Sequence, residues 1–446
     1  MSKQPLVEHD SANIPHWYSP DDDVPTFANG DGSYVYDEAG TEYLDFISQL
    51  YCVNAGHGNE TITARMTEQL DRIQYVASSK HNDTRSQFAD RVVDVAPDNL
   101  TDVSFSISGS EANETAIQLA RDYKDAPKIL TRWQSYHGST YAAAALTGDP
   151  ETRSDIERYA AVTGHGKFLP PLSENGAFEA DSEEELARKA ADHLEFVLRN
   201  ENPDEVAAVL MEPIGGTSGA YPAPADYFQR VREICDRYDV LLIADEVITG
   251  FGRCGEWFGI QTEDVQPDMI TFAKGATSAY APLAGVLIDE EIAAFVHDEG
   301  TAVGQTFGGH PLSCAAGLGA MDAYEDGLLE NVRENAPYLE SRLNELVEAH
   351  DVLNEARGRG YHWSLVFGRP DSGAPFVDPW GPADTEDADN PVSAVRSEAL
   401  ERGVLVGGGR PDTQIILSPP FTAGRKEIDI AVDALDKAIS AAFEAY

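Results

Sequence analysis

The chain has 446 residues, of which 77 are aspartate or glutamate and 32 are lysine or arginine, so its formal net charge is −45. This charge argues against nucleic acid and anionic membranes as natural partners. At this length, 42% hydrophobic residues are enough to bury a large core, and we expect two domains. The acidic residues are dispersed along the chain, which resembles a halophilic protein from a salt-rich cytoplasm, where screening relieves self-repulsion.

The cysteines and the hydropathy pattern narrow the class of protein further. The four cysteines are widely spaced with no C-x-x-C pair, so neither a zinc site nor a disulfide framework is predicted. No apolar signal region follows the N-terminus, and no window approaches the ~20 apolar residues that span a bilayer. The sequence therefore predicts a cytoplasmic protein without a metal.

The N-terminal third begins with a polar, proline-rich arm over residues 1–30. Residues 32–46 then alternate around an acidic glycine turn, which predicts a β-hairpin. From about residue 62 the pattern becomes helical. Strands and helices alternate thereafter, which predicts a mostly parallel sheet with helices on its faces. The expected strands are 103–107, 128–131, 206–211, 240–244 and 269–273, and the expected helices among them are 111–123 and 225–238.

The last third has a different pattern. A long helical stretch runs from residue 311 to about 350 with a break near Gly327, followed by strands at 361–367 and 415–417 and a final helix at 425–446. The acidic segment 368–390 is expected to be a mobile loop. We predict an arm and hairpin over 1–60, a large cofactor-binding domain over 61–310, and a small α+β domain over 311–446 that the hairpin joins.

Two charged residues follow two of the expected buried strands. Asp245 ends the apolar run 240–244, and Lys274 follows 269–273. The carboxyl ends of strands are where open α/β sheets hold ligands. A lysine at such a position loses solvation, which lowers its pKa and frees the amine for imine chemistry with a carbonyl. Taken singly, each residue is more often a cap or a solvated charge, but the pair indicates a site.

A third element strengthens this interpretation. Ser108-Gly109-Ser110 follows the strand 103–107 and opens the helix 111–123. A glycine-serine turn at a helix N-terminus presents unpaired N–H groups and the positive end of the helix dipole, which suits a phosphate. An ordinary serine cap would have the same sequence.

Seven segments, in order, resemble the class III pyridoxal-phosphate-dependent aminotransferases. They are SGSEANETAI (108–117), WQSYHGST (133–140), MEPIGG (211–216), LLIADEVITGFGR (241–253), TFAKG (271–275), GQTFGGHP (304–311) and LSPPF (417–421). LYCVNAGHG at 50–58 also resembles the ω-amino acid:pyruvate branch. The resemblance implies the type I fold of pyridoxal-phosphate enzymes, with a large domain around a mostly parallel sheet and a smaller α+β domain from both termini.

The resemblance also implies roles for the charged residues. Lys274 would bind the cofactor as an imine and then move a proton on the substrate, and Asp245 would keep the pyridine nitrogen protonated. Glu212 matches an acid near the cofactor, although a structural cap is almost as good an explanation. His137 has no second histidine at ligand spacing, so we expect it to have a positional role and not to bind a metal.

Further residues would enclose the cofactor. Val247 would pack under the ring and Tyr136 would stack on its other face. Gly109 and Ser110 would bind the phosphate, together with Thr306 of the partner subunit. The resemblance therefore implies a homodimer with shared active sites, possibly a tetramer.

Only a few residues indicate which substrate the protein binds. Thr217 stands where the ornithine and γ-aminobutyrate branches carry a gating glutamate, which points away from those branches. Arg410, before the Pro-Pro strand, is the candidate for a mobile arginine that binds the 2-oxo acid's carboxylate, with Gly407-Gly408-Gly409 as a hinge. Tyr51, and also Trp17 and Tyr18 from the arm, are candidates for the substrate wall.

The leading hypothesis is transamination from an ω-amine or ω-amino acid, such as β-alanine or taurine, to pyruvate or another 2-oxo acid. An aminomutase or a biotin-pathway aminotransferase of the same fold remains an alternative. A binding protein that keeps the fold without the chemistry is a third, but the joint presence of Lys274, Asp245 and the phosphate loop argues against it.

Overall fold

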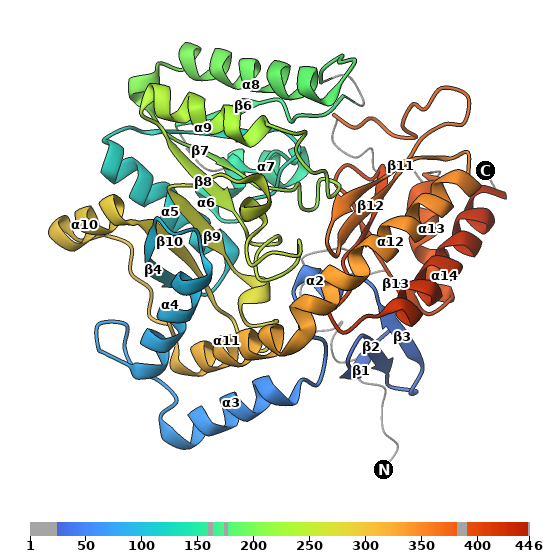
Figure 1. Ribbon diagram of the computed structural model, residues 1–446, viewed down its shortest axis with the longest axis horizontal. Coiled ribbons are helices and arrows are strands. Elements are labelled where there is room, and N and C mark those ends of the chain that lie inside the picture. Colours follow the sequence, from blue (N-terminus) through green and yellow to red (C-terminus); the bar gives the residue numbers. More distant parts are fainter. Residues whose placement is uncertain (1–24, 159–163, 174–176, 381–389, 445–446) are drawn as a thin grey trace.

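A seven-stranded sheet lies at the centre of the larger part of the molecule (Figure 1). The computed structural model describes residues 25–158, 164–173, 177–380 and 390–444. The strand order is β4-β10-β9-β8-β7-β5-β6, with β4 at Leu100–Ser106, β5 at Lys128–Arg132, β6 at His165–Phe168, β7 at Val206–Met211, β8 at Leu241–Asp245, β9 at Met269–Phe272 and β10 at Ala284–Asp289.

The central strands are buried on both faces, which explains their unbroken apolar sequences. Along β8, Leu242 and Ala244 belong to one hydrophobic cluster while Leu241 and Ile243 belong to another on the opposite face. Helices α5 (Gly109–Lys124), α6 (Tyr141–Leu146) and α10 (Glu290–Glu299) contribute to the second cluster, and α8 (Glu183–Asn200) and α9 (Tyr227–Tyr238) contribute to the first. The expected mostly parallel sheet with helices on both faces is confirmed.

Strand β10 is the antiparallel member and was missing from the sequence prediction. It pairs antiparallel with both β4 and β9. A short connection after Lys274 carries the chain back along β9 without a crossover helix, so the βαβ pattern used for prediction does not apply. All other neighbours within the sheet are parallel, and their carboxyl ends therefore meet at one edge.

The helices agree with the predicted pattern, apart from shifts at their ends. The predicted helix 111–123 begins two residues earlier, and the predicted helix 225–238 begins two residues later, at Tyr227. The described helices are α2 (Ser48–Tyr51), α3 (Glu60–Arg72), α4 (Asp83–Val95), α5 (Gly109–Lys124), α6 (Tyr141–Leu146), α7 (Pro150–Glu157), α8 (Glu183–Asn200), α9 (Tyr227–Tyr238), α10 (Glu290–Glu299), α11 (Pro311–Ala323), α12 (Leu329–Ala349), α13 (Pro391–Glu401) and α14 (Arg425–Glu444). None of them is both long and apolar enough to cross a membrane.

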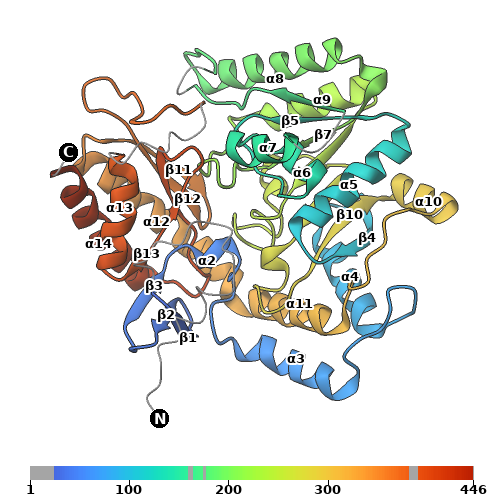
Figure 2. The same ribbon diagram turned by 180° about the vertical axis from the view of Figure 1, so that it is seen from behind.

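The smaller part holds two four-stranded sheets and lies beside the large sheet (Figure 2). One sheet joins the predicted N-terminal hairpin to a C-terminal strand, because β13 pairs parallel to β3. The other has the order β11-β12-β15-β14. The strands are β1 (Phe27–Asp31), β2 (Tyr34–Asp37), β3 (Glu42–Asp45), β11 (Leu353–Arg359), β12 (His362–Phe367), β13 (Val404–Leu405), β14 (Gly407–Gly408) and β15 (Gln414–Leu417). The domain boundaries at residues 60 and 310 stay a prediction.

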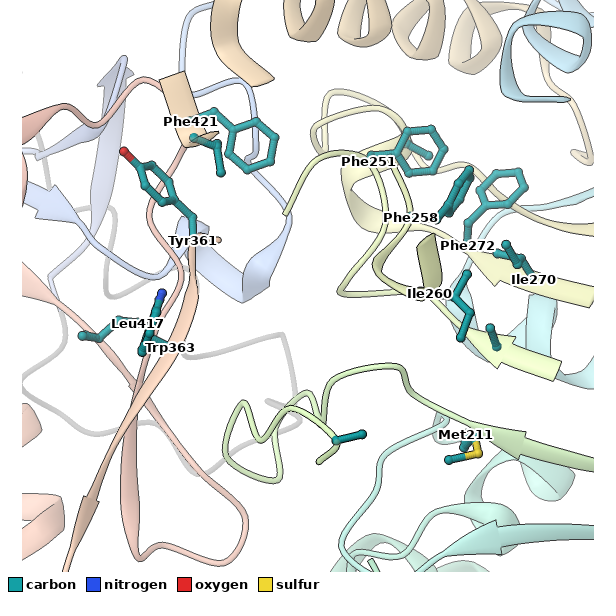
Figure 3. Close-up of a cluster of buried hydrophobic side chains, with 14 of the residues drawn as sticks. Met211, Phe251, Phe258, Ile260, Ile270, Phe272, Tyr361, Trp363, Leu417 and Phe421 are labelled. Atoms are coloured by element: carbon teal, nitrogen blue, oxygen red, sulfur yellow. The ribbon is translucent and has the colours of Figure 1, made fainter. Parts of the chain in front are cut away.

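Aromatic side chains from the two parts face the loop that follows β8. Figure 3 shows Phe251, Phe258 and Phe272 on the side of the large sheet, and Tyr361 and Phe421 on the side of the smaller part. The ring of Phe251 lies 5.5 Å from that of Phe258 and 5.6 Å from that of Phe272, centroid to centroid. This packing fixes the loop after β8, which begins immediately beyond Asp245.

Candidate active site

Lys274 lies just beyond the end of β9, at the start of a short 3-10 turn with a φ of +41°. Its side chain lines a cavity of about 280 Å³ at the carboxyl edge of the large sheet. Burial desolvates the amine and lowers the pKa of Lys274 below its ordinary value. The amine also lies 5.2 Å from the centre of the Tyr51 ring. A larger fraction of this amine is therefore unprotonated and nucleophilic than of a solvated lysine.

Asp245 is the last residue of β8 and lines the same cavity. Its Oδ2 accepts a hydrogen bond from Asn113 Nδ2 at 2.9 Å and lies 2.8 Å from His137 Nδ1. Its Oδ1 accepts from the backbone N–H of Val247 at 3.0 Å. Because the carboxyl group is only 3% exposed, these contacts hold it in one orientation.

His137 and Asn113 form the support behind Asp245. Asn113 Nδ2 also donates to the carbonyl of His137 at 2.7 Å, and the backbone N–H of His137 donates to Thr147 Oγ1 at 2.9 Å. His137 thus has the contacts of a positional residue, and no cluster of metal-binding side chains is found among the described residues. Asn113 was missed as a site residue although it lies within the quoted segment 108–117. Its one sequence signal was a polar residue on the sheet-facing side of α5.

The opposite end of the cavity is formed by two loop segments that contact each other. Gly109 and Ser110 start the 16-residue helix α5, where backbone N–H groups lack acceptors within the helix. The backbone N–H of Ser139 donates to Ser110 Oγ at 3.2 Å. Gly138 has a φ of +133°, and a Cβ there would lie 2.9 Å from Ser110 Cα, so glycine is required for this approach. The helix dipole and these N–H groups favour an anion at this end.

The walls between the two ends are largely apolar. Val247 and Tyr136, the residues expected to cover the two faces of the cofactor ring, both line the cavity. Tyr51 lies at its mouth, 6% exposed, in a strained turn where Ser48, Gln49 and Tyr51 all have positive φ. The cavity therefore offers an acid, an anion-binding helix start and an amine around one space between apolar walls.

A second cavity of about 830 Å³ adjoins the first. Leu50, Tyr51, Thr217 and Arg410 line both, so they form the passage between them. The backbone N–H of Arg410 donates to the carbonyl of Thr217 at 2.7 Å. Gly407 and Gly408, the first two residues of the predicted hinge, form β14 and pair with β15; the hinge itself stays a prediction.

Two predicted site residues, Glu212 and Thr306, do not line the inner cavity, and two more cannot be placed. Glu212 is buried, and its Oε1 accepts from the backbone N–H of Gly216 at 3.1 Å, while its Oε2 lies 3.7 Å from Arg132 Nη2. Thr306 is exposed and away from this cavity, and its carbonyl accepts from Tyr75 Oη at 3.0 Å. The other two, Trp17 and Tyr18, lie outside the described residues.

Comparison with known proteins gives consistent results. Residues 18–439 match the family model described as aminotransferase class-III. The chain is 34% identical over 417 residues to a probable aminotransferase of Mycobacterium tuberculosis, covering 91% of this chain and 87% of that protein. It is 32% identical over 446 residues to a probable mitochondrial gamma-aminobutyrate transaminase 2 of Oryza sativa, covering 96% and 86%. Among solved structures, the taurine:2-oxoglutarate aminotransferase of Bifidobacterium kashiwanohense, in complex with PLP and glutamate, has a TM-score of 0.92, 32% identity and coverage of 99% and 98%.

Proposed function

Since this chain belongs to the class III aminotransferases and depends on pyridoxal phosphate, we propose that it transfers the amino group of an ω-amine or ω-amino acid, such as β-alanine or taurine, to pyruvate or another 2-oxo acid. The observation that carries the substrate assignment is the position of Arg410 in the passage between the inner and outer cavities.

The residues of the inner cavity fit the cofactor. Asp245 would hold the protonated pyridine nitrogen, and Gly109 and Ser110 at the start of α5 would hold the phosphate. Val247 and Tyr136 would cover the two ring faces. The approach of Gly138 to Ser110 supports this fit, because it closes the anion-binding end around a small group.

Pyridoxal phosphate supplies an electron-withdrawing ring that stabilises negative charge on the substrate carbon next to the amine. Lys274 Nζ, which burial desolvates, would take the proton from that carbon and return one during the reverse half of the reaction. Asn113, His137 and the Val247 amide fix the Asp245 carboxylate, which would keep the proton on the ring nitrogen. That charge-assisted contact is worth about 1.5–3 kcal/mol.

Arg410 would bind the carboxylate of the 2-oxo acid through its planar guanidinium, which matches a carboxylate with two parallel hydrogen bonds. Thr217, which lies beside it in both cavities, has no charge with which to compete for this arginine. The outer cavity then leaves room for the rest of a donor such as an ω-amino acid. Both the γ-aminobutyrate and taurine relatives act on compounds of this class, by their names.

We further propose a homodimer with shared active sites. Four large apolar side chains close in sequence to Tyr75 or Thr306 are exposed, with exposed fractions from 41% to 52%: Leu70, Ile73, Tyr75 and Phe307. The rings of Tyr75 and Phe307 contact each other at 6.1 Å between centroids, next to Thr306. Burying such side chains favours association, and a partner over them would receive Thr306 at its own phosphate end.

The substrate assignment is tested by comparing Arg410→Ala with the wild type. Loss of a charge-assisted, bidentate contact should raise KM for pyruvate roughly ten- to hundredfold. An aldehyde acceptor without a carboxylate should be affected much less. Arg402→Ala is the matched control, because Arg402 pairs with Glu398 on α13 and does not line either cavity. An unchanged KM for pyruvate in Arg410→Ala would show that the carboxylate binds elsewhere.

A further inference from the structure

We propose that Asp149 is a specificity-determining positioning residue: its carboxylate holds Arg410 when a substrate brings no carboxylate, and releases it when one does. This inference rests on the proposed function, in which Arg410 binds the carboxylate of the substrate. Asp149 lies before α7, in a segment that neither the family resemblance nor the sequence motifs marked as part of the site.

The geometry places the two charges in direct contact. Arg410 Nη1 lies 3.0 Å from Asp149 Oδ2 and 3.1 Å from Thr152 Oγ1. The Asp149 side chain is 7% exposed and that of Arg410 is 26% exposed, so the pair is only partly screened by solvent. Asp149 lines the outer cavity, whereas Arg410 lines both. Asp149 therefore contacts the arginine from the side of the outer cavity.

Asp149 keeps other partners when Arg410 leaves. Its Oδ2 also accepts from Thr152 Oγ1 at 2.7 Å and from the Thr152 backbone N–H at 3.4 Å. A carboxylate at a helix N-terminus is stabilised by the helix dipole as well. Releasing the guanidinium therefore does not leave a buried carboxylate without a donor, which would be costly.

The backbone around Arg410 favours movement of the side chain alone. The Arg410 N–H is held by the Thr217 carbonyl at 2.7 Å, and β14 before it is paired with β15. The guanidinium can then exchange one carboxylate for another by rotating its own bonds. Its contact with Asp149 faces the outer cavity, and Arg410 also lines the inner cavity that contains Lys274.

A substrate carboxylate and Asp149 thus compete for one cation. A donor or acceptor with a carboxylate must displace Asp149, which weakens its binding. An amine with an apolar group instead binds more tightly, because Asp149 keeps the charged guanidinium of Arg410 away from that group. The strength of the Asp149 contact sets the ratio between these two substrate classes.

The experiment compares Asp149→Asn with the matched control Asp289→Asn. Asparagine keeps the helix cap and removes the charge. Asp289 caps α10 through Ile292 N–H at 2.8 Å and lines neither cavity. Binding of propionate, a carboxylate without an amine, is measured by calorimetry on the holoenzyme. In Asp149→Asn its Kd should fall about three- to tenfold, and the ratio of kcat/KM for β-alanine to that for 1-phenylethylamine should rise by a similar factor.

Asp149→Ser, which also keeps a capping oxygen without the charge, provides a second variant. In the Arg410→Ala background Asp149→Asn should leave the propionate Kd unchanged, because the competing cation is gone. An equal propionate Kd in Asp149→Asn and Asp289→Asn would overturn the proposal. So would an equal loss of kcat/KM for β-alanine and 1-phenylethylamine in Asp149→Asn, accompanied by a lowered unfolding temperature. If Arg410→Ala itself leaves KM for pyruvate unchanged, the proposed function fails instead.

Discussion

The close approach of Gly138 to Ser110 gives a quantitative prediction for cofactor binding. In Gly138→Ala the new Cβ would lie 2.8 Å from Ser110 Cβ and 2.9 Å from Ser110 Cα, against 3.4 Å for ordinary contact. The start of α5 must therefore retreat by about half an ångström. A φ of +133° adds strain of about 1–3 kcal/mol for alanine, whether or not the cofactor is present.

Only the retreat of Ser110 should change cofactor affinity. Losing one charge-assisted hydrogen bond to the phosphate costs about 1.5–3 kcal/mol, so the Kd for pyridoxal phosphate should rise roughly ten- to hundredfold. The assay is a titration of the apoenzyme with pyridoxal phosphate, followed by its visible absorbance. Gly327→Ala is the control, because Gly327 has a φ of +104° and no described atom within 4 Å of its Cβ position.

Both variants should lower the unfolding temperature, Gly138→Ala the more because of its contact with Ser110, but only Gly138→Ala should weaken cofactor binding. An unchanged Kd in Gly138→Ala would refute the assignment of Gly109 and Ser110 as the phosphate-binding end. Equal weakening in both variants would show that general backbone strain, and not the Ser110 contact, governs the affinity.

Three further predictions concern charge. Asp245→Asn keeps a hydrogen-bonding side chain but loses the charge, so the rate of a single amine half-reaction should fall about ten- to hundredfold by stopped-flow absorbance; an unchanged rate would contradict its role at the ring nitrogen. Burial lowers the pKa of His362 from 6.5 to about 3, so below pH 6.5 the unfolded chain gains a proton that the folded chain does not. Relative to His362→Gln, the wild type should lose about 2 kcal/mol of unfolding free energy between pH 6.5 and pH 5, measured by urea unfolding. If the unfolding free energies of the two proteins change in parallel with pH, His362 does not make this contribution. With a net charge of −45, the unfolding temperature should rise from about 0.1 M to about 2 M salt; a flat or falling curve would reject adaptation to salt.

Features that are set by residues close together in the sequence could be predicted from it. The apolar runs of β8 and β9 identified buried strands, and the charged residues at their ends identified Asp245 and Lys274. Gly109 and Ser110, which begin α5, indicated the anion-binding end. Each of these signals arises within about ten residues of chain, because strand burial and helix dipoles are local consequences of the sequence pattern.

Contacts between distant segments were decided by the tertiary structure. Asn113 and Asp245 are 132 residues apart, and Asp149 and Arg410 are 261 residues apart. Strand β10 likewise pairs antiparallel with two strands, and one of them, β4, lies nearly 180 residues earlier in the chain. No local pattern specifies which polar groups meet in this way. Their pairing follows from how the sheet and the smaller part pack, since buried polar groups are stable only where that packing brings a partner within hydrogen-bonding distance.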